Sequence, residues 1–293
     1  MSDLEQIAIE RLKTASEMSL SVYEQPLVVC ISGGKDSSVI TELAIRAGIP
    51  VEFMHNHTTA DAPETVYFVR QEFKRLEELG YKCTLNMPTY KGESVSMWSL
   101  IPQKLMPPTR KVRYCCSVLK EGGGAGRFIA TGVRWAESAS RSKGRGIYEK
   151  NGDKDHRVLL MDDNDDRRRL FENCRLKSKR TVNPIIDWKD DQLWDFIGDA
   201  KKPLNPLYSE GYCRIGCPGC PKADQKAREQ EFMRWPAYKN MYMIAFRNMI
   251  AFRNMAGKHT VWTKPEEVFN FWMEYDILPG QLNWFEDFEE LEE

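Results

Sequence analysis

The chain has 293 residues, enough for one large domain or two smaller ones with a sizeable core. Its formal net charge of -1 excludes a bulk electrostatic attraction to nucleic acid or membrane, so any such contact needs a local patch. No apolar run approaches the roughly 18 residues of a membrane span. The first twenty residues read as an amphipathic helix and lack the pattern of a signal peptide, so we expect a cytoplasmic protein that does not bind membranes.

Strand and helix patterns alternate along the first two thirds of the chain. Short apolar runs predict strands at residues 27–31, 51–55, 81–85, 127–133 and 185–188. Runs with helical spacing predict helices at residues 37–47, 63–79 and 190–197. This alternation predicts an α/β fold with a mostly parallel sheet and helices on both faces.

Residues 141–181 depart from this alternation. The stretch is crowded with charged side chains, as in MDDNDDRRRLFENCRLKSKR. We expect an insertion, either a solvated charged loop or, between Arg167 and Arg180, a basic track that contacts a polyanion such as DNA or RNA.

The region after Pro203 is rich in Cys, Met, Trp and Tyr and has a helical pattern. We therefore expect an α/β domain at residues 1–200 and a smaller, cysteine-rich helical subdomain at residues 201–293. Within the latter, the hexapeptide MIAFRN occurs twice in succession, at residues 243–254. A six-residue period matches no repeat architecture, so we expect a local duplication inside one helix.

The segment Ser-Gly-Gly-Lys-Asp-Ser-Ser, residues 32–38, directly follows the first predicted strand. The glycines allow the backbone to approach an anion closely, because no Cβ stands in the way. A Gly-rich turn that leads into a helix also points several backbone N–H groups into one concavity, at the positive end of the helix dipole. Serine hydroxyls and the Lys35 ammonium would complete a phosphate cradle. The alternative is a plain strand-to-helix turn with an N-cap serine.

Five of the eight cysteines fall into two tight groups. Cys115 and Cys116 are adjacent, and Cys213, Cys217 and Cys220 follow later in the chain. Such thiols can enclose a [4Fe–4S] cluster, bind structural zinc in tetrahedral geometry, or pack as core residues without metal. A disulfide framework is not expected in a protein without an export signal.

The SGGKDS segment resembles the pyrophosphate-binding loop of the N-type ATP pyrophosphatases, the PP-loop superfamily, and of the sulfonucleotide reductases. Further segments resemble the phosphoadenosine phosphosulfate reductase family, in the order of that family, across residues 28–221. These are HTTADAPET at residues 57–65, TGVR at 131–134 with Glu137, Ser138 and Arg141 after it, PIIDW at 184–188, and NPLY through GCPGC at 205–220.

The resemblance implies a Rossmann-like fold, similar to the adenine nucleotide alpha-hydrolases, that binds an adenine nucleotide at the carboxyl edge of its sheet. The nucleotide-binding residues that it implies are Ser32, Gly33, Gly34, Lys35, Asp36, Ser37, Ser38, Thr58, Gly132 and Arg134. It also implies that catalysis rests on Lys35, Asp36, Arg134 and Arg141. The two arginines would pair with phosphate or sulfate oxygens, and Asp36 would either hold Mg²⁺ or orient Lys35.

The reductases that bind adenylyl sulfate hold [4Fe–4S] with a tandem cysteine pair and a later C-x-x-C. That resemblance implies Cys115, Cys116, Cys217 and Cys220 as ligands, with Cys213 as an additional thiol. A C-x₃-C-x₂-C set could instead use Cys213 and release Cys115 as a sulfur carrier or nucleophile.

One departure from the reductases concerns their nucleophile. Their C-terminal cysteine motif, similar to E-C-G-[IL]-H, has no match here, because Cys220 is the last cysteine of the sequence. The order of GVRWAES, a charged insertion, NPIIDW and a cysteine group resembles instead the ATP-pyrophosphatase component of DNA phosphorothioation systems. This second resemblance implies cleavage of ATP to AMP and pyrophosphate, with adenylation of an acceptor before sulfur arrives.

We therefore predict an ATP pyrophosphatase that adenylates an acceptor for sulfur transfer. The alternatives are a phosphoadenylyl or adenylyl sulfate reductase that uses a thiol such as Cys115 or Cys213, and a nucleotide-binding regulator without turnover. The expected cofactors are [4Fe–4S] or Zn²⁺, ATP or a sulfonucleotide, and Mg²⁺. The expected partners are an adenine nucleotide, a sulfur donor such as a cysteine desulfurase, and DNA or RNA.

Overall fold

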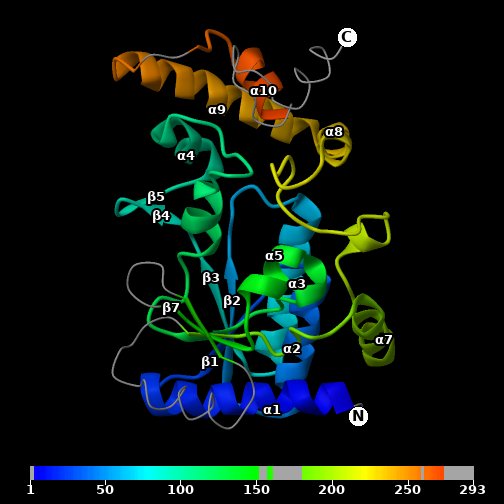
Figure 1. Cartoon of the computed structure of the whole chain (residues 1–293). Helices are drawn as coiled ribbons and strands as arrows, with labels where there is room; N and C mark the ends of the chain where they lie inside the picture. The colour runs from blue at the N-terminus through cyan, green and yellow to red at the C-terminus, as the bar shows by residue number, and fades with distance from the viewer. Residues whose placement is uncertain (1–2, 152–156, 161–179, 259–260, 274–293) are drawn as a thin grey trace, which may run out of the picture. The chain divides into compact units, whose positions relative to one another are not determined.

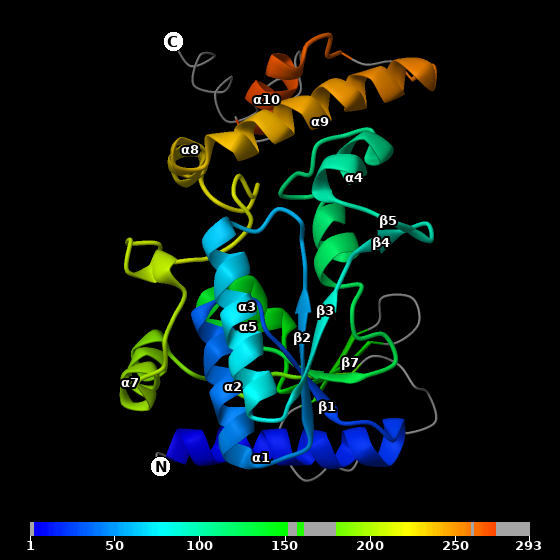
Figure 2. The same ribbon diagram turned by 180° about the vertical axis from the view of Figure 1, so that it is seen from behind.

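The computed structural model describes residues 3–151, 157–160, 180–258 and 261–273 (Figures 1 and 2). The chain divides into two compact units, each built from several segments. The first comprises Met1–Asn56, Pro63–Asn86 and Gly122–Ile215, and the second His57–Ala62, Met87–Glu121 and Gly216–Glu293. The domain boundary that we expect near residue 200 stays a prediction.

A seven-stranded sheet, in the order β3-β2-β1-β6-β9-β7-β8, forms the centre of the first unit. Its strands are β1 (Leu27–Cys30), β2 (Val51–Asn56), β3 (Lys82–Asn86), β6 (Phe128–Ala130), β7 (Tyr148–Asn151), β8 (Arg157–Leu160) and β9 (Arg180–Val182). The strands β3, β2, β1, β6 and β9 run parallel, and β7 and β8 add to the β9 side in antiparallel pairs. The predicted α/β fold with a mostly parallel sheet is confirmed.

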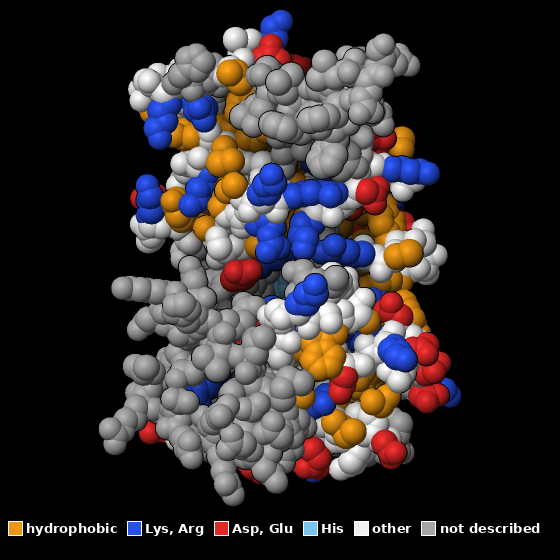
Figure 3. Space-filling model, in the orientation of Figure 1, with side chains coloured by type: hydrophobic (Ala, Val, Ile, Leu, Met, Phe, Trp, Pro, Cys, Tyr) orange, Lys and Arg blue, Asp and Glu red, His pale blue; other side chains and the backbone are white. Residues whose placement is uncertain are grey.

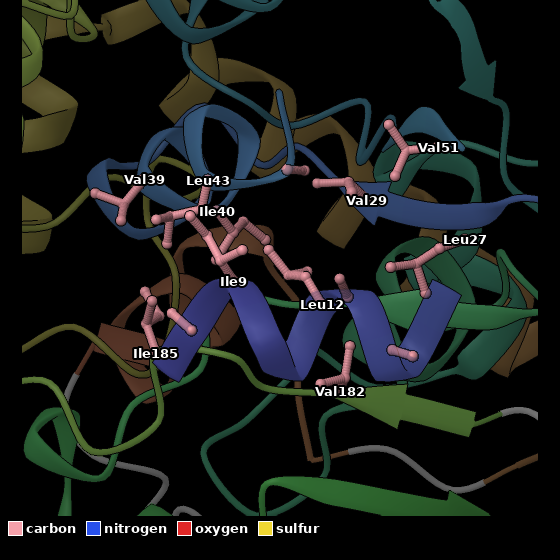
Figure 4. Close-up of a cluster of buried hydrophobic side chains, with 14 of the residues drawn as sticks. Ile9, Leu12, Leu27, Val29, Val39, Ile40, Leu43, Val51, Val182 and Ile185 are labelled. Carbon is pink, nitrogen blue, oxygen red and sulfur yellow. The ribbon is translucent and has the colours of Figure 1, made fainter. Parts of the chain in front are cut away.

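Helices cover the sheet of the first unit, and the predicted ones are present. They are α1 (Asp3–Met18), α2 (Lys35–Ala47), α3 (Pro63–Glu78), α5 (Ala139–Gly144) and α7 (Asp190–Ala200), with the short turns η1 (Ser19–Tyr23), η3 (Trp135–Glu137) and η5 (Pro206–Tyr208). In the main core, Leu12 of α1 and Ile40 of α2 belong to the same buried cluster as Val29 of β1 (Figure 4). Because strand side chains alternate between faces, Val28 instead joins Met54 and Ile129 in a small separate cluster.

The predicted strand at residues 185–188 is wrong. The pairing strand is β9, whose Thr181 lies opposite Ile129, and the chain then turns at residues 184–187. Pro184 has no backbone N–H to offer a ladder, so the strand ends before it. Ile185 and Ile186 are nevertheless fully buried, which explains why this turn has the apolar pattern of a strand.

The insertion at residues 141–181 is more ordered than a charged loop, where the structure describes it. Its segment β7 pairs antiparallel with β9, and Glu149 of β7 is buried. The Glu149 carboxylate accepts hydrogen bonds from Arg145 Nε at 2.6 Å and Asn183 Nδ2 at 2.8 Å, so its charge is satisfied internally. Of the predicted basic track, Arg180 is buried in β9, and residues 167–179 lie outside the described residues.

The second unit is mainly helical, as expected for the cysteine-rich part. It contains β4 (Thr89–Tyr90), β5 (Glu93–Ser94), α4 (Met97–Lys104), η2 (Cys116–Lys120), α8 (Gln225–Arg234), α9 (Pro236–Met255) and α10 (Pro265–Met273). Its core is aromatic: the rings of Tyr242 and Trp272 lie 4.4 Å apart, and Trp272 Nε1 donates to Pro108 O at 2.8 Å. This hydrogen bond satisfies the buried indole, as such groups require.

The MIAFRN duplication lies within α9, as predicted. Six residues advance an α-helix by about one and two-thirds turns, so the two copies present different faces. Phe246 is fully buried while Phe252 is 50% exposed, and Ile244 is 52% exposed while Ile250 is 7% exposed. The duplication is therefore not a structural repeat. No helix in the described ranges, α9 included, is both long and apolar enough to cross a membrane.

The contact of Arg11 with Asp187 joins α1 to the turn after β9, and it generates a stability prediction. Arg11 is buried and donates to Asp187 Oδ1 at 2.9 Å and Oδ2 at 2.8 Å. Asp187→Ala removes the counter-ion and should lower the free energy of unfolding by about 2 kcal/mol, measured by urea denaturation. Glu10→Ala is the control, because its ion pair with Lys13 is exposed and should contribute less than about 0.5 kcal/mol. Equal effects of both substitutions would contradict the prediction.

Candidate functional site

The segment at residues 32–38, called the loop here, runs from the carboxyl end of β1 into the first turn of α2. Gly33 has a φ of +79°, and a Cβ placed on it would lie 2.7 Å from Thr65 Cγ2, so only glycine fits. Gly34 is the N-cap of α2 and has no side chain to cap the helix. Ser37 Oγ donates to Gly34 O at 2.8 Å and accepts from Ser32 N at 3.2 Å, which fixes the loop from within. The loop thus lacks side chains at two successive positions before α2, and its role as an anion cradle stays a prediction.

Lys35, Asp36 and Arg134 form one charged group. Lys35 Nζ lies 3.4 Å from Asp36 Oδ2, and Arg134 Nε donates to Asp36 Oδ1 at 2.6 Å. Arg134 also donates to Asp190 Oδ1 at 2.7 Å and to Trp188 O at 3.1 Å. Burial opposes the charge of Arg134, but these two carboxylates outweigh it and raise its pKa.

These contacts bear on the two roles left open for Asp36. Both of its oxygens contact cationic side chains, an arrangement that suits orientation of Lys35 better than direct metal binding. Arg134 is only 1% exposed and is engaged by protein partners, so the geometry suits a residue that positions Asp36. A phosphate-clamping role for Arg134 stays a prediction.

Gly132 lies against the start of α2. It follows β6, and a Cβ placed on it would lie 2.7 Å from the backbone carbonyl carbon of Asp36. The carboxyl ends of the parallel strands β1 and β6 meet at one edge of the sheet, the usual ligand-binding edge of such folds. This close approach explains why glycine occupies the position.

Arg141, on α5, lies near the cationic side chains of Arg145 and Arg214. It forms an ion pair with Glu137. Burial lowers the pKa of Arg141, and the nearby cations Arg145 and Arg214 lower it further. Figure 3 shows Lys and Arg side chains gathered on one face of the molecule. A bound anion would relieve this repulsion, so Arg141 is better placed than the buried Arg134 to meet a phosphate.

Three residues at the loop were not among the predicted site residues. Asn205 is buried, and its Nδ2 donates to Gly33 O at 3.3 Å and to Thr65 Oγ1 at 3.0 Å. The Tyr208 hydroxyl accepts the N–H of Lys35 at 2.8 Å, and Asp190 is the second partner of Arg134. The NPLY motif was visible in the sequence, but only the tertiary contact shows what its Asn and Tyr touch.

Four of the five clustered cysteines belong to the second unit. Cys115 and Cys116 lie at the start of η2, and Cys217 and Cys220 flank a turn in which Cys220 N donates to Cys217 O at 3.0 Å. A Cβ placed on Gly219 in this turn would lie 2.4 Å from Phe232 Cζ, so glycine is required there as well.

These thiols influence one another's ionisation. A hydrogen bond with Cys115, aided by the Lys120 cation, lowers the pKa of Cys116. Burial raises the pKa of Cys217 to about 11. The negative charge of a thiolate at Cys217 raises the pKa of Lys120, with Asp61, Cys220 and Cys116 adding to this effect. Lys120, a residue that sequence reasoning missed, therefore provides positive charge for the thiolates.

Cysteine sulfur is the ligand type of both [4Fe–4S] clusters and tetrahedral zinc sites. Among the described residues no three of these sulfurs lie within 4.8 Å of one another, so a metal centre at the thiols stays a prediction. Thr58, predicted to bind nucleotide, lies in the same unit, and its Oγ1 accepts from Cys217 Sγ at 3.4 Å. Cys213 is exposed and belongs to the first unit. We refer to the other four, Cys115, Cys116, Cys217 and Cys220, as the four-thiol group, and their role as metal ligands stays a prediction.

The close approach at Gly132 yields a prediction. Gly132→Ala forces a methyl group against the backbone of Asp36 and should lower the free energy of unfolding by about 2 kcal/mol, measured by urea denaturation. Gly144→Ala is the matched control, because nothing lies within 4 Å of its added Cβ and it should change stability by less than about 0.5 kcal/mol. A destabilised control with an unaffected Gly132 variant would refute this reading.

The two candidate ligand sets make different predictions for metal binding. Single Cys→Ser substitutions at positions 115, 116, 217 and 220 should lower the iron or zinc bound per chain, measured by elemental analysis after anaerobic reconstitution. Cys213→Ser should bind as much metal as the unaltered protein, because Cys213 lies outside the four-thiol group. Metal loss in Cys213→Ser together with retention in Cys115→Ser would favour the C-x₃-C-x₂-C set instead.

Known proteins resemble this chain in sequence and structure. An uncharacterized protein of Methanocaldococcus jannaschii is 25% identical over 287 residues, which covers 92% of this chain and 59% of that protein. An adenosine 5′-phosphosulfate reductase of Allochromatium vinosum is 37% identical over 54 residues, 18% of this chain and 21% of the reductase. The chain thus spans about three fifths of the first relative and a fifth of the second.

Among solved structures, the phosphoadenylyl-sulfate reductase of Candida auris, in a phosphate complex, aligns with a TM-score of 0.42 and 17% identity over 74% of this chain and 96% of that one. The family model of the phosphoadenosine phosphosulfate reductase domain matches residues 26–223, which is more than half of the chain. This range includes the loop, the Arg134 segment and all five clustered cysteines. The chain belongs to the phosphoadenosine phosphosulfate reductase family.

Proposed function

We propose that this protein is a PP-loop ATP pyrophosphatase that adenylates an acceptor for sulfur transfer. The observation that carries the proposal is the loop before α2, where Gly33 and Gly34 leave the backbone open and Lys35 stands at the helix N-terminus. Such a loop suits the pyrophosphate end of a nucleotide. The four-thiol group supplies the second part of the proposal, because thiolate and iron–sulfur centres suit sulfur chemistry.

In the proposed reaction an acceptor oxygen attacks the α-phosphorus of ATP. A new P–O bond forms, the bond between the α-phosphorus and the bridging oxygen breaks, and pyrophosphate leaves with the electron pair. Lys35, oriented by Asp36, offsets the charge that develops on the pyrophosphate, together with Mg²⁺ held by the phosphates themselves. The adenylated acceptor then loses AMP when a sulfur nucleophile replaces it.

The two arginines have different proposed roles. Arg134 positions Asp36 and, through it, Lys35, because its guanidinium is buried between Asp36 and Asp190. Arg141 binds a phosphate of the nucleotide or of the acceptor, since it lies among the cations Arg145 and Arg214. Gly132 permits this arrangement by leaving room for the start of α2.

The metal centre that we propose is a [4Fe–4S] cluster held by Cys115, Cys116, Cys217 and Cys220, with Zn²⁺ as the alternative. When bound, such a cluster would hold or pass on sulfur. The chain itself contributes Lys120, whose cation stabilises the thiolate ligands. A cysteine desulfurase is the class of sulfur donor that this proposal requires, and DNA or RNA is the class of acceptor that the charge around Arg141 suits.

A second candidate is a sulfonucleotide reductase. Family membership and the local identity to an adenosine 5′-phosphosulfate reductase favour it, although that similarity spans only 54 residues. In such an enzyme a protein thiol would attack the sulfonucleotide sulfur, displace AMP or adenosine 3′,5′-bisphosphate and release sulfite on reduction by an external thiol. Cys213 is exposed and outside the four-thiol group, so it is the cysteine to test for that role.

The test of the proposed function is the product formed from α-labelled ATP. We expect AMP, not ADP, from the reconstituted protein with Mg²⁺ and an acceptor, tested first with DNA. Lys35→Ala should lower the rate at least about a hundredfold, because it removes the cation that meets the pyrophosphate. Lys74→Ala should leave the rate unchanged, because Lys74 is an exposed residue of α3.

Other products would decide against the pyrophosphatase. Sulfite release from a sulfonucleotide with a thiol donor, without AMP from ATP, would establish the reductase. Tight ATP binding without turnover on any acceptor would favour a nucleotide-binding regulator.

A further inference from the structure

The hydroxyl of Tyr208 lies beside Gly34 and Lys35 of the loop. The hydroxyl accepts the backbone N–H of Lys35 at 2.8 Å and lies 3.5 Å from where a Cβ on Gly34 would stand. Lys35 is the first residue of α2, so this N–H is one that an anion in the cradle would otherwise receive. In this structure the hydroxyl of Tyr208, which is distant in the sequence, accepts that N–H in place of an anion.

The Tyr208 hydroxyl accepts the Lys35 N–H and can still donate a hydrogen bond of its own. A phenol has one proton to donate as well as lone pairs to accept, and here the accepting side is used by the Lys35 amide. Within the part of the chain that the structure describes, that amide is the one hydrogen-bond partner of the Tyr208 hydroxyl. Burial, with a contribution from the Asp36 charge, raises the pKa of Tyr208 to about 12, so the group keeps its proton at neutral pH.

The segment that carries Tyr208 is anchored independently of any ligand. Asn205 Oδ1 accepts the Leu207 N–H at 3.1 Å and caps η5, while its Nδ2 donates to Gly33 O. The Lys202 side chain is 5% exposed, and its Nζ lies 2.7 Å from Glu72 Oε1 of α3. The Trp194 ring meets the Tyr208 ring edge-on, with 5.8 Å between centroids. The backbone segment and the ring of Tyr208 are thus held in place without a ligand. Such fixed placement is the condition for a preorganised donor.

We propose that Tyr208 is a further binding residue of the phosphate cradle, whose O–H donates to an oxygen of the pyrophosphate moiety and so relays the Lys35 N–H to the ligand. This inference rests on the proposed function and concerns the same loop. Because the hydroxyl lies at the loop, it contacts the β- and γ-phosphates of ATP and the pyrophosphate product. The adenosine and α-phosphate end of the nucleotide gains nothing from it.

The opposite arrangement is physically possible and serves as the contrary hypothesis. The hydroxyl would then compete with the anion for the Lys35 N–H and would have to leave before pyrophosphate could bind. A donor relay predicts weaker pyrophosphate binding when the hydroxyl is removed, while a competitor predicts tighter binding.

The experiment is calorimetric titration of the full chain with magnesium pyrophosphate and, separately, with AMP. Tyr208→Phe keeps the ring and its contact with Trp194 but removes the hydroxyl. We expect pyrophosphate affinity to fall about tenfold or more, as for loss of a hydrogen bond to a charged group, with AMP affinity changed less than about twofold. Tyr67→Phe is the matched control, because Tyr67 is 63% exposed on α3 and its loss of a hydroxyl should change neither affinity.

Each other outcome is decisive. Equal or tighter pyrophosphate binding by Tyr208→Phe overturns the relay and leaves the proposed function intact. An equal loss of pyrophosphate and AMP affinity, with a lower thermal unfolding midpoint, also overturns it, because the hydroxyl would then only support the fold of the loop. Absence of pyrophosphate binding and of AMP formation in the unaltered protein overturns the proposed function and the relay together.

Discussion

The buried guanidinium of Arg134 holds the candidate site of the first unit together. It follows the end of β6, and its nitrogens donate to Asp36 at the start of α2 and to Asp190 at the start of α7. A buried arginine must have its charge compensated, so these carboxylates and the arginine depend on one another. Asp36 also contacts the Lys35 ammonium, and the same ion pairs therefore orient the residue that we propose to act on pyrophosphate. Ion pairs as well as apolar packing therefore hold the loop, α2 and the end of β6 together.

The second unit shows a comparable dependence on a tight backbone. The turn between Cys217 and Cys220 contains Gly219, and the ring of Phe232 fills the space that a side chain there would need. Phe232 belongs to the aromatic core with Tyr242 and Trp272. The backbone of this turn is thus set by core packing. The same turn carries Cys217 and Cys220, which we propose as metal ligands.

Membership in the phosphoadenosine phosphosulfate reductase family leaves the reaction open, since a fold hosts chemistry through the particular residues of its site. What distinguishes the candidate reactions here is local. The loop before α2 suits a pyrophosphate leaving group, and the exposed Cys213 suits a thiol nucleophile. The contact of Tyr208 with the Lys35 amide belongs to the first of these and gives the loop a donor that no backbone amide supplies.

Sequence patterns were sufficient to predict the α/β class, the helices α2, α3 and α7, and the glycine loop. These follow from local signals: hydrophobic period, capping residues and a glycine pair directly after a buried strand. The cysteine spacing indicated two groups of thiols but left their ligand set open. Only the folded structure shows that residues 185–188 form a buried turn, that part of the charged insertion pairs with β9, and that Arg134 is buried between two carboxylates. It also decided that Tyr208 meets Lys35. Those outcomes depend on partners thirty or more residues away in the chain. Neither the period nor the composition of a segment records which distant group will satisfy its charge or its hydrogen bonds.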